Sequence, residues 1–108
     1  MANLKIIKKS KTLVREIQKY KLKKKKIGFV PTLGALHKGH LELIRLAKKE
    51  SDIVVVSIFL NPLQFNSKSD FKKYPTNLVT DKKKINKEKV NILYIPSIND
   101  VFPSKKTK

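Results

Sequence analysis

Two histidines, His37 and His40, have the type and spacing to do chemistry, and the sequence contains no others. They stand three residues apart where an amphipathic segment begins, which puts both imidazoles on one face if that segment is a helix. A helix N-terminus presents backbone N–H groups and the positive end of the macrodipole, so two imidazoles beside it make a site for a phosphate chain. Gly39 between them costs about 1 kcal/mol in a helix relative to alanine, and it leaves room for a group close to the backbone. These residues point to a nucleotide, with ordinary surface or capping histidines as the alternative.

A longer motif surrounds these histidines. The string from Pro31 to His40, Pro-Thr-Leu-Gly-Ala-Leu-His-Lys-Gly-His, resembles the Pro-Thr-Met-Gly-x-Leu-His-x-Gly-His signature of the pantothenate synthetase family. His-x-Gly-His alone marks only the wider nucleotidyltransferase superfamily, whereas the ten-residue string is specific. Residues 54–65 resemble the second block of the family, and Tyr74 with Asp81 seven residues later fits a third. The resemblance reaches about Pro103, and the second half of the family is absent.

The resemblance implies an ATP-dependent ligase that condenses pantoate with β-alanine through a pantoyl-adenylate intermediate, releasing AMP and diphosphate. Cations, N–H donors and Mg²⁺ must offset the repulsion of two anions in the first step. One preorganised donor is worth about 3 kcal/mol in such a transition state, so we expect His40→Ala to slow the complete enzyme at least about a hundredfold. The resemblance implies that His37 and His40 are catalytic and that the ATP-binding positions are Pro31, Thr32, Leu33, Gly34, His37, Gly39 and His40.

Four further roles follow from the resemblance. Gln64 corresponds to a residue that binds pantoate oxygens, and Asn61 to one that lines the same pocket. Tyr74 corresponds to a residue at the rim of the active site, and Asp81 to an acidic position associated with Mg²⁺. From the residues alone, Asn61 before proline is also a turn former, and Asp81 is also a solvated helix charge. Leu33 replaces the methionine of the family, a swap that keeps an apolar packing role.

The apolar pattern predicts the elements that position these residues. Residues 52–59 are almost continuously apolar, which is typical of a parallel strand covered on both faces. Further strands are expected at 27–30, ending at Pro31, and at 90–95, with residues 1–7 as a short lead that is partly apolar. Helices are expected at about 10–22, 38–50 and 76–89.

Some details of the helices can also be predicted. Ser10 or Thr12 is a candidate cap for the first helix. Leu43 and Leu46 are expected to widen the buried face of the second helix. In the third helix, Leu78 and Ile85 are expected to hold the buried face, after a long loop over 61–75.

The order of strands and helices predicts an α/β fold with a parallel sheet, right-handed crossovers and a ligand at the carboxyl ends of the strands. Both strong motifs begin at such an end. Together with the resemblance, the pattern predicts a Rossmann-like, three-layer nucleotidyltransferase domain that is truncated. It is expected to cover residues 1–103, the N-terminal ATP- and pantoate-binding part, with a basic tail at 104–108.

The formal net charge of +18 invites comparison with nucleic-acid-binding proteins. Arg15 and Arg45 are the only arginines among the 26 basic residues, whereas arginine is the usual residue for reading guanine and gripping phosphate. The abundant Lys, Ile and Asn residues have A/T-rich codons, so we attribute the charge to a biased genome. We expect no specific nucleic acid partner, only salt-sensitive retention of polyanions.

The composition also bears on the cellular location of the protein. The sequence has no cysteine, no apolar run near the roughly 20 residues of a membrane span, and no secretory signal, so we expect a cytoplasmic protein without membrane contact. The resemblance implies ATP, pantoate and β-alanine as substrates, Mg²⁺ as cofactor, and a homodimer in the full-length family. From this half we expect weak ATP binding at most and no turnover. The alternatives are another small nucleotidyltransferase of the superfamily and a basic remnant that is non-catalytic or binds nucleic acid.

Overall fold

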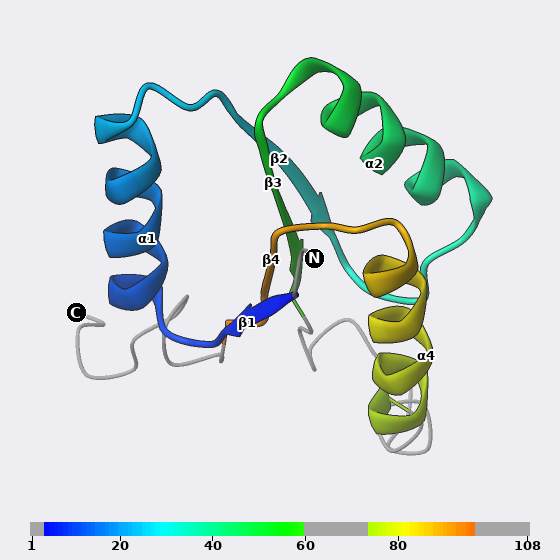
Figure 1. The fold of residues 1–108 in the computed structure, drawn as a ribbon. Coiled ribbons are helices and arrows are strands. Elements are labelled where there is room, and N and C mark those ends of the chain that lie inside the picture. Colours follow the sequence, from blue (N-terminus) through cyan, green and yellow to red (C-terminus); the bar gives the residue numbers. More distant parts are fainter. Residues whose placement is uncertain (1–3, 60–73, 97–108) are drawn as a thin grey trace, which may run out of the picture.

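A computed structural model describes residues 4–59 and 74–96, the first four of the second range by their backbone alone. Strands and helices alternate along the chain (Figure 1). They are β1 (Lys5–Ile7), α1 (Ser10–Leu22), β2 (Ile27–Thr32), α2 (Lys38–Glu50), β3 (Ile53–Ile58), α4 (Tyr74–Lys87) and β4 (Ile92–Tyr94). No helix in these two ranges is long and apolar enough to cross a membrane.

The four strands form one parallel sheet in the order β1-β4-β3-β2. Helix α1 covers one face of the sheet, and α2 and α4 cover the other (Figure 1). This arrangement confirms the predicted α/β architecture with a parallel sheet and three layers. Strands β2 and β3 run side by side to their carboxyl ends, where Thr32 pairs with Ile58.

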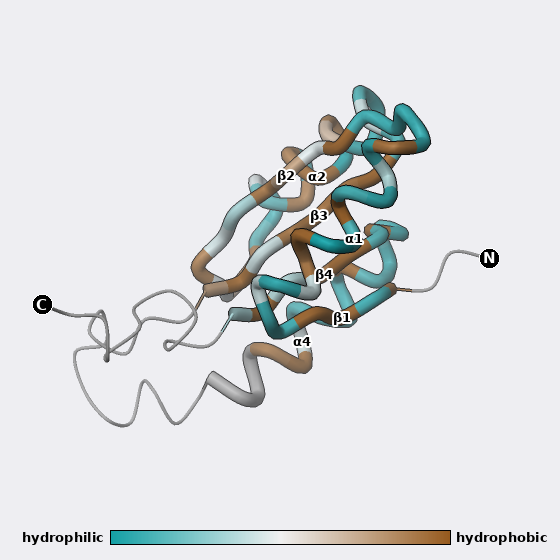
Figure 2. The backbone as a smooth tube through the Cα atoms, turned by 90° about the vertical axis from the view of Figure 1, so that its left-hand side faces the viewer, coloured by the Kyte–Doolittle hydropathy of each residue, from teal (hydrophilic) through white to brown (hydrophobic). Residues whose placement is uncertain are grey.

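The core lies on both faces of β3, whose six residues are all buried, as its continuous apolar pattern predicts. Val54 and Val56 face α2 and α4, where they pack in one cluster with Ile44 and Ile85. Val55, pointing the other way, packs under α1 in a second cluster with Leu13 and others. Figure 2 shows β3 as a largely hydrophobic strand between helices whose residues alternate between hydrophobic and hydrophilic.

Two strands differ from the expectations. The lead at 1–7 contains β1, which was missed because three residues carry little pattern and their partner, β4, lies far along the chain. Strand β2 continues through Pro31 to Thr32 and does not end at the proline. The chain tolerates Pro31 because β2 pairs on one side only in the described sheet, so no second neighbour needs its missing N–H.

The helices follow the predicted ranges with three corrections. The N-cap of α1 is Lys9, without a side-chain hydrogen bond, so neither Ser10 nor Thr12 caps it. Helix α4 begins at Tyr74, ahead of the predicted start. On α2, Leu43 and Leu46 are half exposed and do not widen the buried face. With Phe29 and other residues they line an open groove of about 470 Å³ beside β2.

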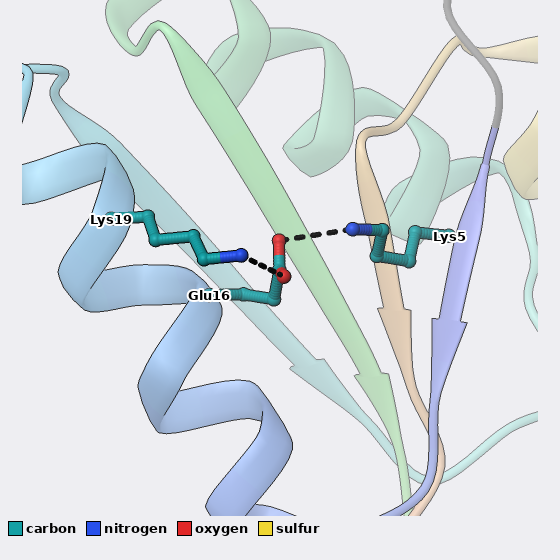
Figure 3. A network of polar contacts seen from close by, with 3 residues as sticks. All are labelled: Lys5, Glu16 and Lys19. Atoms are coloured by element: carbon teal, nitrogen blue, oxygen red, sulfur yellow. Dashed lines mark hydrogen bonds and ion pairs between the residues drawn. The ribbon is translucent and has the colours of Figure 1, made fainter.

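A polar network fastens the short strand β1 to α1 (Figure 3). The carboxylate of Glu16 accepts hydrogen bonds from Lys5 of β1 at 3.1 Å and from Lys19 at 3.4 Å. The hydrogen bond from Lys5 is the main reason that the pKa of Glu16 lies below its ordinary value. Both lysine side chains are more than half exposed, so each ion pair contributes at most about 1 kcal/mol.

Gly28 of β2 lies against the C-terminal end of α2. A Cβ there would stand 2.5 Å from the Oγ of Ser51, 3.2 Å from its Cβ and 3.4 Å from the Cβ of Ala47. We expect Gly28→Ala to lower the free energy of unfolding by about 1–3 kcal/mol, the usual cost of overpacking. Urea unfolding measures the loss. Adding Ser51→Ala removes the nearest atom and should recover part of it, and no recovery would contradict this cause.

Candidate functional site at the carboxyl end of β2

The two predicted catalytic histidines lie together where the loop after β2 enters α2. His37 is the N-cap of the helix, and its Nδ1 accepts a hydrogen bond from the N–H of Gly39 at 3.1 Å. His40 stands one turn later, and its Nδ1 accepts from the N–H of His37, also at 3.1 Å. The ring centroids are 4.0 Å apart. The two side chains thus form a reciprocal capping box at the helix start.

These hydrogen bonds fix the position of the proton on each ring. A neutral imidazole carries one N–H, and a nitrogen that accepts a backbone N–H cannot carry it. Each ring therefore holds its proton on Nε2, which is the donor it can offer to an outside acceptor. The helix end differs here from the expectation of free backbone donors, because the N–H groups of His37 and Gly39 are already occupied. The imidazoles add two donors of their own, the Nε2–H groups, beside this helix start.

The pKa of His40 lies below its ordinary value. Burial of the ring is the main cause, the neighbouring His37 adds to it, and the negative charge of Asp81 acts in the opposite direction. These causes favour the neutral form of His40. A neutral imidazole keeps Nδ1 available to the cap and keeps a single proton on Nε2.

The lowered pKa of His40 predicts a pH dependence of stability. The unfolded chain takes up a proton on this ring near pH 6.5, whereas the folded chain does so only at a lower pH. Between these two values the unfolded state binds more protons, so the free energy of unfolding falls as the pH is lowered through this window. Urea unfolding between about pH 5 and 8 measures the slope.

The control for this slope is His40→Gln, which removes the titrating ring and keeps a side-chain acceptor at the third helical position. We expect the variant to have a flatter profile in the same window. The carboxylates of Glu16 and Glu88 do not confuse the result, because their pKa values are lowered from an already acidic range. An unchanged slope in His40→Gln would contradict the assignment.

The loop between β2 and α2 has an unusual backbone that is anchored first to the sheet. Gly34 and Ala35 have φ angles of 92° and 53°, in the left-handed region. The hydroxyl of the buried Thr32 accepts from the N–H of Gly34 at 3.2 Å and donates to the carbonyl of Ser57 on β3 at 2.9 Å. The Thr32 side chain therefore holds the turn, while its backbone carbonyl accepts from the N–H of Phe59 at 3.1 Å, and the contact of its backbone with ATP stays a prediction.

The second anchor comes from α4. Asp81 is 1% exposed, and its two oxygens accept from the N–H groups of Ala35 at 2.8 Å and Leu36 at 2.9 Å. The ammonium group of Lys84, one turn later, donates to the carbonyl of Leu36 at 2.7 Å. The structure thus gives Asp81 a task that the sequence analysis did not foresee, and its contact with magnesium stays a prediction.

A signal for the burial of Asp81 exists in the sequence. It stands three residues after Leu78 and four before Ile85, the two residues expected on the buried face of this helix, so it shares that face. Sequence reasoning missed Lys84, because nothing local shows that its side chain reaches another segment. Groups of three or more His, Cys, Asp or Glu side chains able to hold a metal ion do not occur among the described residues.

The structure places some of the other predicted site residues, and others lie outside its described ranges. Gly39 makes room for the ring of His37, because a Cβ there would lie 3.1 Å from its Cε1. Leu33 is 60% exposed at the start of the loop. Tyr74 is the first residue of α4, described by its backbone alone. Asn61 and Gln64, like the predicted tail at 104–108, lie outside the described residues.

Comparison with known proteins matches the sequence of this chain to one family. A family model described as pantoate-beta-alanine ligase matches residues 5–108. A pantothenate synthetase of Buchnera aphidicola is 52% identical over 99 residues, which are 92% of this chain and 35% of the relative. One from Thermodesulfovibrio yellowstonii is 50% identical over 92 residues, or 84% of this chain and 33% of that protein.

Solved structures also match the fold of this chain. The crystal structure of a pantoate-beta-alanine ligase from Francisella tularensis, complexed with beta-gamma ATP and beta-alanine, matches with a TM-score of 0.76 and 43% identity. The match covers 94% of this chain and 39% of that one. A pantothenate synthetase from Thermus thermophilus matches with a TM-score of 0.70 and 34% identity, over 96% of this chain and 36% of that one. The chain thus spans about a third of the length of the curated relatives it matches.

Proposed function

Because this chain belongs to the pantoate-beta-alanine ligase family, we propose that it supplies the ATP-binding part of such a ligase. The observation that carries the proposal is the pair of imidazoles at the carboxyl end of β2. Their Nδ1 atoms are held by the backbone and their Nε2 protons are left for an outside acceptor. The matching Francisella ligase was crystallised with an ATP analogue, which supports a nucleotide as the ligand.

The proposed reaction is the ATP-dependent condensation of pantoate with β-alanine. The carboxylate of pantoate attacks the α-phosphorus of ATP to give pantoyl adenylate and diphosphate, and the amine of β-alanine then displaces AMP. Negative charge accumulates on the phosphate oxygens in the first step. In our proposal, the Nε2 protons of His37 and His40 donate to those oxygens, a role typically worth about 3 kcal/mol for a preorganised donor.

The remaining substrate contacts belong to the same proposal. Gln64 and Asn61 bind pantoate, Tyr74 rims the site, and Mg²⁺ accompanies the phosphates, all as the family resemblance implies. The loop backbone at Leu33 and Gly34 follows the carboxyl end of β2, where ligands of parallel α/β folds bind. Because the chain spans about a third of its relatives, turnover and the homodimer of the full-length family are proposed for the whole protein and not for these residues.

Thermal melting of the chain with Mg-ATP and pantoate, added singly and together, tests the proposal. A ligand at a hundred times its Kd adds about 2.7 kcal/mol to the free energy of unfolding, which raises the melting temperature by several degrees. We expect a shift with Mg-ATP that grows when pantoate is added. A strongly basic chain also attracts polyanions, so inorganic triphosphate at the same concentration is the control. Equal shifts with ATP and triphosphate would reduce the finding to charge alone.

A further inference from the structure

Helix α4 holds the backbone of the loop through two side chains one turn apart. Asp81 accepts the N–H groups of Ala35 and Leu36, and Lys84 donates to the carbonyl of Leu36. Both polar backbone groups of Leu36 are therefore bonded to the same helix. The side chain of Leu36 packs in the hydrophobic core, and the residue is only 3% exposed. Both the backbone and the side chain of Leu36 are therefore held in place.

The residue after Leu36 is the first histidine of the pair. His37 caps α2 in an extended conformation, with φ −128° and ψ −174°. Its N–H donates a hydrogen bond to Nδ1 of His40. The orientation of the peptide between Leu36 and His37 is thus set on one side by Lys84 and on the other by His40. A rotation of that peptide would withdraw the N–H from His40 and release the proton position of its ring.

We propose that Asp81 and Lys84 are positioning residues, which orient the imidazoles of His37 and His40 by holding the backbone of residues 35–36. The proposal rests on the proposed function for its consequence in ATP binding, but its structural part stands on the three hydrogen bonds alone. Asp81 fixes the left-handed turn, and Lys84 fixes the peptide that leads into the cap. Neither side chain needs to touch the nucleotide.

The test compares Lys84→Met with Lys83→Met in the whole chain. Lys83 is the exposed neighbour on α4, so the control removes the same charge and keeps the loop bonds. Nitrogen NMR of the histidine rings is the readout that a purely structural role would not move, and the sequence has only two histidines to assign. In the unmodified chain, each Nδ1 should resonate as an unprotonated nitrogen and each Nε2 as a protonated one.

We expect Lys84→Met to average the two nitrogen signals of at least His40, with both tautomers populated, and Lys83→Met to leave them unchanged. Because a small misplacement of catalytic groups can cost up to about a hundredfold, we also expect Mg-ATP to bind Lys84→Met at least about tenfold more weakly. Asp81→Asn, examined below its melting temperature, should average the same signals. Lys84→Arg keeps a donor and should restore them.

The outcomes separate the two proposals. Averaged ring signals in Lys84→Met, with an unmodified chain that fails to bind Mg-ATP, would support the positioning role and overturn the proposed function. Unchanged ring signals in both Lys84→Met and Asp81→Asn would overturn the positioning role, whatever the affinity for ATP. Equal changes in Lys84→Met and Lys83→Met would overturn it as well, because they would report the charge of α4 and not the bond to Leu36.

Discussion

Asp81→Asn is expected to lower the free energy of unfolding by about 3 kcal/mol. The carboxylate is buried, and its two oxygens accept backbone N–H groups from two consecutive residues. An asparagine accepts one of these bonds and presents an NH₂ group to the other donor. A hydrogen bond to a charged acceptor contributes about 1.5–3 kcal/mol, and a buried donor left unpaired costs about 1–3 kcal/mol. A domain of this size has roughly 5–15 kcal/mol in all, so the loss is a large share.

The chain offers a matched control for this substitution. The carboxylate of Asp52 also accepts a backbone N–H, from Lys26 at 2.7 Å, but at an exposed position. We expect Asp52→Asn to cost about 1 kcal/mol or less, because water replaces the lost bond. Urea unfolding of both variants, with and without Mg²⁺, makes the comparison. If Asp81→Asn kept its stability and lost a response to Mg²⁺, the anchor would be wrong and the magnesium assignment right.

The hydrogen bonds to Asp81 explain how the loop keeps its strained backbone conformation. Ala35 has a φ of 53°, which costs an ordinary residue roughly 1–2 kcal/mol because its Cβ crowds the following carbonyl. The charged bonds from Asp81 offset that cost at the strained residue itself. Thr32 ties the preceding turn to β3, so the loop is fixed to the sheet on one side and to α4 on the other. The histidines are thereby placed by elements that lie far apart in the sequence.

Local pattern was sufficient wherever the determining contacts are local. Helix α2 has the predicted bounds, because its apolar spacing lies within one segment. The burial of all of β3 follows from its own composition. In the same way, the spacing of His37 and His40 was enough to predict that the two rings lie on one face of a helix start.

The missed features depend on partners elsewhere in the chain. Strand β1 exists because β4 offers it an edge, and three residues cannot show this by themselves. Leu43 and Leu46 repeat with helical spacing, yet the sheet ends at β2 in the described residues, so little covers them. Lys84 contacts a loop nearly fifty residues earlier in the chain. Nothing in the sequence distinguishes it from the other lysines, of which there are 24 in all.

The two histidines occupy positions where other residues cap a helix better. Ser, Thr, Asp and Asn are preferred at the N-cap, and Glu or Gln at the third helical position completes a capping box. An acidic side chain would also interact favourably with the helix dipole, yet the first turn of α2 has none. A site that serves only the helix would not need two imidazoles there. A site for a phosphate chain would, because carboxylates repel it.

The double variant His37→Asp/His40→Glu should therefore change stability and binding in opposite directions. We expect the free energy of unfolding to rise by about 1–2 kcal/mol, from better caps and the favourable charge at the helix end. We expect Mg-ATP to bind at least about a hundredfold more weakly, because two donors become two anions beside the phosphates. Thermal melting without ligand and isothermal titration with Mg-ATP measure the two effects on the same protein.

The control variant must remove two positive charges without touching the loop. Lys25→Gln/Lys26→Gln does so just before β2, at the end of that strand opposite His37. It should bind Mg-ATP within a few fold of the unmodified chain, because exposed charges at such a distance are largely screened by salt. If both double variants lost affinity equally, the loss would come from net charge. If His37→Asp/His40→Glu were less stable than the unmodified chain, the imidazoles would be there for the fold, and the functional reading of the pair would fail.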